Sequence, residues 1–261
     1  MNRSNPILKI ITTTCYSFLY LPLVVIVIFS FNSARFPAPW TSFTFGWYDE
    51  LIFRSPALWD SFRVSLKVAS ISTFLSLSMS LMFVYWISHG ARIDRWVTLF
   101  YGNLIVPEIV LAVALLSFFT LFQIPLGNQA LIVAHTLLGL GFSLPMLYAR
   151  YCQLDPKLYE ASLVLGATLK QTFFKITIPL LKPALFSTAV LVFVLSFDDF
   201  VLSYFCAGSE SQTLSLYLLS MLRSEVSPVV NALSSLLLLI SSILALVYYS
   251  LMSRRGEKPH V

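Results

Sequence analysis

Three acidic residues stand in long apolar stretches of the sequence, where a charge is costly. Glu108 lies in one such stretch, and Asp198 and Asp199 lie side by side in another. A carboxylate near the centre of a bilayer costs about 2.5 to 3.5 kcal/mol, so such acids usually face the interior of a helix bundle and act there. Three roles are open to them: binding a cation in transit, relaying protons, or holding helices together by hydrogen bonds.

The elements that must position these acids are membrane-spanning helices. The chain is 57% hydrophobic and only 11% charged, whereas about a quarter of the residues of a soluble domain are charged. A spanning helix needs roughly 20 mostly apolar residues. We predict an all-α polytopic membrane protein with one transmembrane domain over residues 1–261 and six spans, at about residues 11–31, 64–87, 97–122, 130–149, 183–205 and 229–252.

The predicted spans give each acid an approximate depth. Glu108 falls near the middle of the third span, and the aspartates lie roughly 7 Å outward from the middle of the fifth. Adjacent residues on a helix point about 100° apart, so one aspartate of the pair should face a path at a time. No lysine or arginine occupies the central part of any span, which predicts an uncompensated acidic path suited to a cation. His135 alone could assist a proton relay, but a lone intramembrane histidine is more often packed and hydrogen-bonded.

The basic residues indicate the orientation of the chain. Cytoplasmic loops are enriched in lysine and arginine, and these residues are scattered between the apolar stretches, which disfavours nucleic-acid binding. With both termini in the cytoplasm, the inner face of the membrane would hold most of the 17 basic residues. These are Arg3, Lys9, Arg92, Arg95, Arg150, Lys157, Lys170, Lys175, Lys182, Arg254, Arg255 and Lys258.

The inner loop at about residues 155–182 carries strong helix signals. Asp155 before Pro156 predicts the start of a short helix, and Gly166 predicts its left-handed end. Thr168 and Gln171 have the spacing of a capping box for a second short helix, which should reach about Ile176 before Pro179 stops it. The loop's apolar residues need a partner, either the chain's own helix ends or another protein. They are Leu158, Leu163, Val164, Leu165, Leu169, Phe173 and Phe174.

This loop resembles the EAA motif of ABC-importer permeases. Glu160-Ala161-Ser162 precedes Gly166-Ala167 at the motif's spacing, with Ser162 in place of its second alanine. The resemblance implies a type I ABC-importer permease fold in which cytoplasmic coupling helices contact an ATP-binding subunit through Glu160, Ala161, Gly166 and Ala167. The chain itself has no G-x-x-x-x-G-K-[ST] phosphate loop. ATP hydrolysis is therefore expected in a partner, and the chain is not expected to be an enzyme.

A wider resemblance covers nearly the whole chain. The segments LSFDDFVLSYF (195–205), SEVSPVVNALSS (224–235), VPEIVLAVALL (106–116) and FNSARF to GWY (31–48) are similar to the PotC/PotI-like permeases of spermidine/putrescine importers. This resemblance implies that polyamines are passed from a periplasmic binding protein to a path between this chain and a second permease, driven by two ATPase copies. The implied pathway residues are Glu108, Ser196, Asp198 and Asp199, with Trp47 and Tyr48 adding cation–π attraction.

Two alternatives stay open at this point. The chain could be an ABC permease for another cation or small solute, or a proton-coupled secondary carrier that uses the acids as a relay. No cofactor or metal site is expected, because no convergent set of nucleophile, base and metal ligands is found in the sequence.

Overall fold

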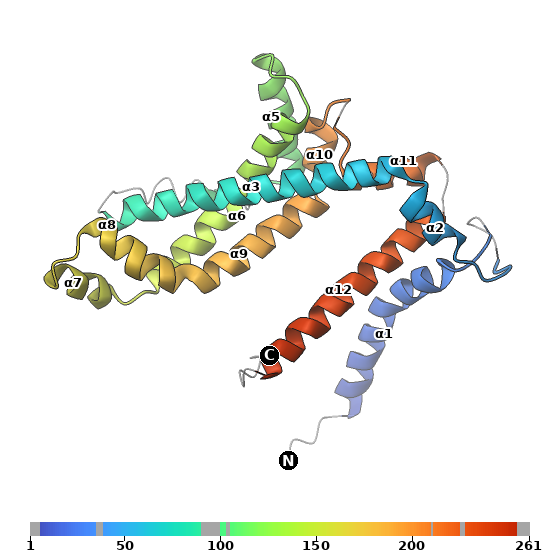
Figure 1. The fold of residues 1–261 in the computed structure, drawn as a ribbon, viewed down its shortest axis with the longest axis horizontal. Helices are drawn as coiled ribbons and strands as arrows, with labels where there is room; N and C mark the ends of the chain where they lie inside the picture. The colour runs from blue at the N-terminus through green and yellow to red at the C-terminus, as the bar shows by residue number, and fades with distance from the viewer. Residues whose placement is uncertain are drawn as a thin grey trace. The chain divides into compact units, whose positions relative to one another are not determined.

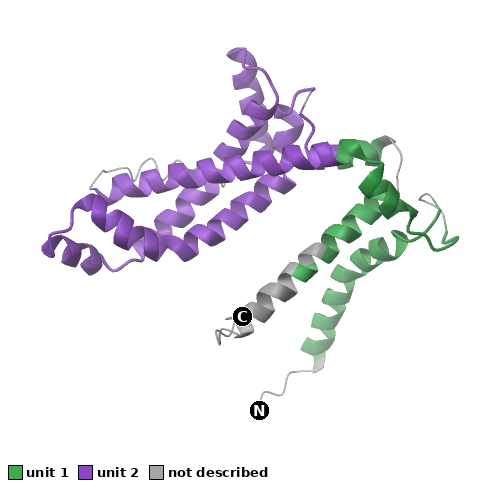
Figure 2. Ribbon diagram, in the orientation of Figure 1, with its two compact units in different colours: residues 1–58, 218–261 green, residues 59–217 purple. Residues whose placement is uncertain are grey.

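The computed structural model describes residues 6–34, 39–89, 100–102, 105–209, 211–224 and 228–254. The chain divides into two compact units, residues 1–58 with 218–261, and residues 59–217 (Figure 2). Arg3, Arg35, Arg92, Arg95, Arg255 and Lys258, together with the first residues of the predicted third span, lie outside the described residues.

The described part is helical, as predicted, with one isolated β-bridge between Asn32 and Phe43. Figure 1 labels the elements. Unit 1 contains α1 (Pro6–Phe29), α2 (Gly46–Phe53) and α12 (Pro228–Arg254). Unit 2 contains most of α3 (Pro56–Ser88), then α5 (Glu108–Leu121), α6 (Asn128–Cys152), α7 (Pro156–Val164), α8 (Leu169–Thr172), the π-helix η1 (Phe173–Thr177), α9 (Ile178–Asp198) and α10 (Val201–Cys206). Helix α11 (Leu214–Ser224) runs from unit 2 into unit 1.

Four helical stretches among the described residues are long and apolar enough to cross a membrane. They are Ile7–Phe29, Pro56–Ser88, Asn128–Cys152 and Leu169–Asp198. The third and sixth predicted spans overlap α5 and α12. Large apolar side chains such as Phe18 and Phe186 are more than two thirds exposed on these helices, as expected of surfaces that face lipid.

Unit 1 is held together by polar contacts near the start of α2. The hydroxyl of Tyr48 hydrogen-bonds with Ser30 Oγ at 2.7 Å and with Ser235 Oγ of α12 at 2.6 Å. The indole Nε1 of Trp47 donates to the carbonyl oxygen of Asn32 at 2.7 Å. The polar atoms of both aromatic residues are therefore engaged within this unit.

Small residues pack α3 closely against α6 in unit 2. Ser80 and Ser143 share a 2.7 Å hydrogen bond, and Ser72 donates to the carbonyl oxygen of Ile132. A Cβ at Gly139 would lie only 2.8 Å from Val192 Cγ1 and 2.9 Å from Ser76 Oγ. Small residues and interhelical hydrogen bonds are the usual means by which helices associate in a membrane.

The buried core of unit 2 has two parts. One lies where α3, α5, α6 and α10 meet, and the other lies at the opposite end of α6, where Leu147 packs with Phe173 and Leu181. The first cluster comprises Val68, Ala112, Leu115, Phe119, Ala130, Leu131, Ala134, Leu202, Cys206 and Ala207. It anchors the short helix α10 to the longer helices and so supports the segment that precedes α10.

The prediction that Pro179 ends the second loop helix is wrong. Helix α8 continues through η1 into α9, so that Leu169–Asp198 is one helical stretch. In the π-turn the Ile178 N–H donates to the carbonyl oxygen of Phe173, five residues back. A π-turn is wider than an α-helical turn. The extra width gives the proline ring room beside the carbonyl group of the preceding turn, with which it would otherwise clash.

Two predicted helix interiors are also corrected. The fifth predicted span, 183–205, is two helices, because α9 ends at Asp198 and α10 begins at Val201. Glu108 does not lie mid-helix but in the first turn of α5, after Pro107, whose φ of −56° and ψ of 134° are extended. All three acids therefore stand at helix ends.

Candidate substrate pathway

The break between α9 and α10 centres on Asp199. Its backbone is extended, with φ −61° and ψ 128°. Its carboxylate accepts the backbone N–H of Ser203 at 2.9 Å and that of Leu202 at 3.4 Å, and its carbonyl oxygen accepts Ser215 Oγ at 2.7 Å. Asp199 thus satisfies amide groups at the start of α10 that the helix itself cannot satisfy.

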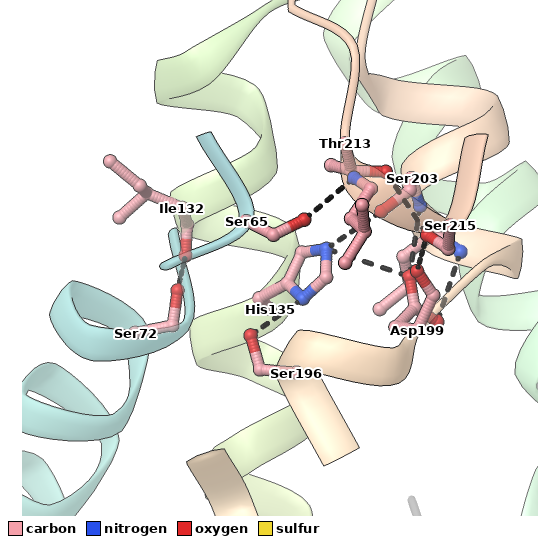
Figure 3. Close-up of polar contacts among 11 residues, drawn as sticks. Ser65, Ser72, Ile132, His135, Ser196, Asp199, Ser203, Thr213 and Ser215 are labelled. Carbon is pink, nitrogen blue, oxygen red and sulfur yellow. Dashed lines mark hydrogen bonds and ion pairs between the residues drawn. The ribbon is translucent and has the colours of Figure 1, made fainter. Parts of the chain in front are cut away.

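His135 of α6 closes a buried polar network around this break. Figure 3 shows its ring between Ser196 and Asp199. The ring Nδ1 lies 2.8 Å from Ser196 Oγ, and Nε2 lies 3.5 Å from both Asp199 Oδ2 and Ser203 Oγ. The side chains of His135 and Asp199 are each 1% exposed. Such buried polar groups are tolerated when they are hydrogen-bonded to one another.

A cleft of about 400 Å³ opens beside this network. Its charged lining residues, among those described, are Glu108, Asp198 and Asp199. Glu108 and Asp198 are exposed, whereas Asp199 is buried. The apolar walls are formed by Val106, Leu111, Leu138, Phe142, Val194, Leu195, Phe200 and Val201. Non-helical backbone at membrane depth is tolerated where it is buried in protein or lines a cavity, and residues 199–200 meet that condition.

The structure thus brings together the three predicted acids but gives them different surroundings. Asp199 differs from the other two acids because the His135 ring lies against it. Ser196, predicted in the pathway, is buried and directed at His135 (Figure 3). Trp47 and Tyr48 belong to unit 1.

Sequence reasoning expected His135 to be packed and hydrogen-bonded, which the structure confirms. It missed the pairing of His135 with Asp199 and the roles of Ser203 and Ser215. The His135–Ser203 pair is 68 residues apart in the chain, and no local spacing pattern connects such positions. The signal that could have found this pair is that His135 and Ser203 are polar residues within apolar helical segments, where each needs a hydrogen-bonding partner. Within the described ranges, no three His, Cys, Asp or Glu side chains are arranged to hold a metal ion.

The inner loop forms as predicted at its first helix and capping box. Asp155 caps α7 by accepting the N–H of Lys157 at 2.9 Å, and Gly166 has a φ of +83°. The Thr168 side chain accepts the Gln171 N–H while the Gln171 side chain accepts the Thr168 N–H. These local contacts build α7 and α8 without help from distant residues.

Ser162, the departure from the EAA motif, ties α7 to α8. It is 5% exposed and shares a 2.7 Å hydrogen bond with Thr172 Oγ1. The predicted contact residues Glu160, Ala161 and Gly166 are exposed, and Ala167 is half-buried. Of the loop's apolar residues Phe173 is buried in the chain's own core, whereas Val164 and Leu165 are each 87% exposed. The segment therefore packs partly on its own chain and leaves an apolar tip uncovered.

A family model described as "Binding-protein-dependent transport system inner membrane component" matches residues 1–255. The curated relatives are of similar length. The spermidine/putrescine transport system permease protein PotC of Escherichia coli (strain K12) is 36% identical over 236 residues, which cover 90% of this chain and 89% of the relative. The putrescine transport system permease protein PotI of the same strain is 29% identical over 94% of this chain and 90% of its own length. PotC of Haemophilus influenzae is 31% identical over 93% of this chain and 94% of its own length.

Solved structures share the fold. A crystal structure of a bacterial ABC transporter involved in the import of the acidic polysaccharide alginate has a chain that aligns with a TM-score of 0.68 over 96% of this chain and 95% of its own. A second structure, of a bacterial alginate ABC transporter in complex with a periplasmic protein bound to an alginate pentasaccharide, aligns with a TM-score of 0.69 over 97% and 95%. Both chains are 15% identical to this one, so the likeness shows the fold alone.

Proposed function

The chain belongs to the family of binding-protein-dependent transport system inner membrane components, and we propose that it is the permease subunit of an ATP-driven importer of spermidine or putrescine. The three relatives described above carry these substrates in their names, and each match covers at least 90% of the chain. The chain is a transporter component without its own active site, and ATP hydrolysis resides in a separate subunit.

The cleft beside the α9–α10 break is the observation that carries the substrate proposal. Its described lining combines exposed carboxylates at Glu108 and Asp198 with apolar walls, and it contains no described basic residue. Ammonium groups separated by methylene segments match both parts of this lining. The solved neighbours are involved in import of an acidic polysaccharide. The shared fold therefore does not by itself determine the charge of the cargo, and the proposal depends on the side chains of this cleft.

The acids should bind ammonium groups only transiently, because conduction needs a site that releases its cargo. In this proposal Glu108 and Asp198 contact the ammonium groups directly. The Asp199 carboxylate does not, because protein groups already occupy it. Trp47 and Tyr48 can offer a cation only their ring faces, since their polar atoms are engaged within unit 1. A cation–π contact contributes about 0.5 to 2 kcal/mol.

The proposed mechanism is alternating access with six spans and both termini in the cytoplasm. A second homologous permease completes the path, and a loaded periplasmic binding protein docks on the outer face. Two copies of the ATPase hold the coupling segments, in this chain through Glu160, Ala161, Gly166 and Ala167. The exposed apolar tip of α7, Val164 and Leu165, supports this contact because a helix of nine residues cannot bury these side chains itself.

Polyamine uptake by the reconstituted complex with its binding protein and ATPase tests this function. Asp198→Asn and Glu108→Gln should each lower uptake by about tenfold or more, the factor for losing one hydrogen bond to a charged group. Asp60→Asn is the matched control, since Asp60 is an exposed acid that pairs with Arg63 on α3 and is not among the residues lining the cleft. Glu160→Ala should leave ATP hydrolysis poorly coupled to uptake.

Three outcomes would contradict parts of the proposal. Full polyamine transport by this chain without an ATPase would overturn the importer architecture in favour of an autonomous carrier. Normal uptake by both cleft variants would leave the architecture standing and remove the acids from the path. If other cationic solutes inhibit polyamine uptake as strongly as unlabelled polyamine does, the chain would be assigned a broader range of cationic cargo.

A further inference from the structure

The His135 imidazole has no direct place in the proposed path, yet it is the centre of the buried network beside it. It is 1% exposed in an apolar helix. Both ring nitrogens have partners on the α9–α10 side, Ser196 through Nδ1 and Asp199 and Ser203 through Nε2 (Figure 3). A purely space-filling role would not need a polar side chain here, because burying an imidazole is favourable only if its hydrogen bonds are made.

The partners of His135 lie on both sides of the helix break. Ser196 is in the last turn of α9, Asp199 is in the break and Ser203 is in α10. An imidazole that contacts all three fixes the residue at which α9 ends. Asp198 follows Ser196 by two residues, about 200° around α9, so any rotation of the last turn away from His135 would turn the Asp198 side chain with it.

Asp199 connects His135 to the start of α10, beside the cleft. Its carboxylate is shared among the N–H groups of Leu202 and Ser203 and the His135 ring. A carboxylate with this many protein partners has little capacity left for a substrate ammonium group. Asp198 and Glu108 are the exposed acids that line the same cleft.

We propose that His135 is a positioning residue of the substrate pathway: by holding Ser196 and Asp199 it fixes the α9–α10 break and so directs Asp198, with Glu108, into the cleft. Asp199 is then the internal support of the site, and Asp198 and Glu108 are the residues that meet the cation. This inference rests on the proposed function for the identity of the cation, but the positioning itself does not depend on transport.

Thiol accessibility at position 198 tests the positioning directly. The full complex would carry Asp198→Cys in a background with Cys15→Ser, Cys152→Ser and Cys206→Ala, and the labelling rate with 2-aminoethyl methanethiosulfonate would be measured in membranes. His135→Leu should slow labelling of the introduced thiol by about tenfold or more, corresponding to the loss of one hydrogen bond to a charged group. His135→Gln, which keeps a donor and an acceptor, should stay within about threefold of the parent.

Thr136→Val is the matched control on the same helix. It removes a buried hydroxyl that bonds only to the carbonyl oxygen of Ile132, so labelling of the thiol at position 198 should be unchanged. Equal labelling rates in His135→Leu and the parent would overturn the proposal. If His135→Leu fails to assemble, Ser196→Ala decides instead: it removes the Nδ1 partner and should slow labelling by about threefold, and an unchanged rate would overturn the proposal.

Transport by the same substitutions in the native background separates this inference from the proposed function. With Asp198 present, His135→Leu should raise the KM for polyamine uptake more than it lowers the maximal rate, and His135→Gln should restore the KM. Normal polyamine uptake by Asp198→Asn and Glu108→Gln in the native background would count against the polyamine path alone. Dependence of labelling on His135 would still support the positioning role.

Discussion

Two aspartates, Asp155 and Asp199, stand at the starts of short helices, and they differ in what else they touch. Asp155 is exposed and caps α7 through the N–H of Lys157, two residues away. Asp199 is buried and joins α10 to His135 of α6 and, through its carbonyl oxygen, to Ser215 of α11. The first aspartate stabilises a short exposed helix through a local contact, whereas the second joins three helices to one another. The same capping chemistry therefore serves an exposed segment in one place and a buried network in the other.

The largest expected effect comes from removing each of these aspartates in turn. Asp199→Ala should destabilise the complex by about 2 to 6 kcal/mol, because it leaves the buried N–H groups of Leu202 and Ser203 without their acceptor at about 1 to 3 kcal/mol each. Asp155→Ala should cost about 1 kcal/mol, the usual value of a helix cap. Thermal unfolding of the purified complex in detergent would measure both as shifts in apparent Tm. Equal shifts would show that the two caps are equivalent and would break the comparison.

Two glycines extend this comparison between the packed helices and the exposed loop, and their substitution should have the next largest effects on stability. Gly139→Ala should cost about 1 to 3 kcal/mol by overpacking against Val192 and Ser76. Gly166 has a φ of +83° and nothing within 4 Å of an added Cβ, so Gly166→Ala should cost about 1 to 2 kcal/mol from backbone strain alone. Asparagine, which tolerates the left-handed conformation, should recover most of the loss at 166 and none of it at 139. The same unfolding assay, with Ala and Asn at each site, checks this; recovery by Asn at 139 would contradict it.

Ser162→Ala should give the smallest effect. It removes the 2.7 Å hydrogen bond to Thr172, but the Thr172 hydroxyl keeps a bond to the carbonyl oxygen of Thr168 at 3.2 Å, so no buried group is orphaned. We expect a loss of about 1 kcal/mol or less, seen as faster hydrogen exchange of the α7 amides in the assembled complex, with uptake nearly unchanged. Thr168→Val, which removes the side-chain acceptor of the capping box, is the control that should loosen α8 first. Unchanged exchange in Ser162→Ala would show that the serine does not tie α7 to α8.

The sequence was sufficient where structure depends on neighbours a few residues apart. The cap at Asp155, the left-handed Gly166 and the Thr168–Gln171 capping box were all predicted from spacing, because each contact closes within one helical turn. The continuation of the helix through Pro179 was not predicted, since a π-turn has no clear sequence signal. The break at Asp199 was missed for a different reason: apolar composition runs on through residues 199–205, and the partners that hold the break, His135 above all, come from another helix.

Helix α9 has a mechanical consequence. Its 21 residues make an element about 31 Å long, with the π-turn η1 at one end and Asp198 at the other. A tilt of about 10° around the η1 end displaces the far end by about 5 Å at this length. The helix can therefore act as a lever arm, in which a small rotation beside α7 and α8 becomes a displacement of the Asp198 carboxylate larger than its own side chain.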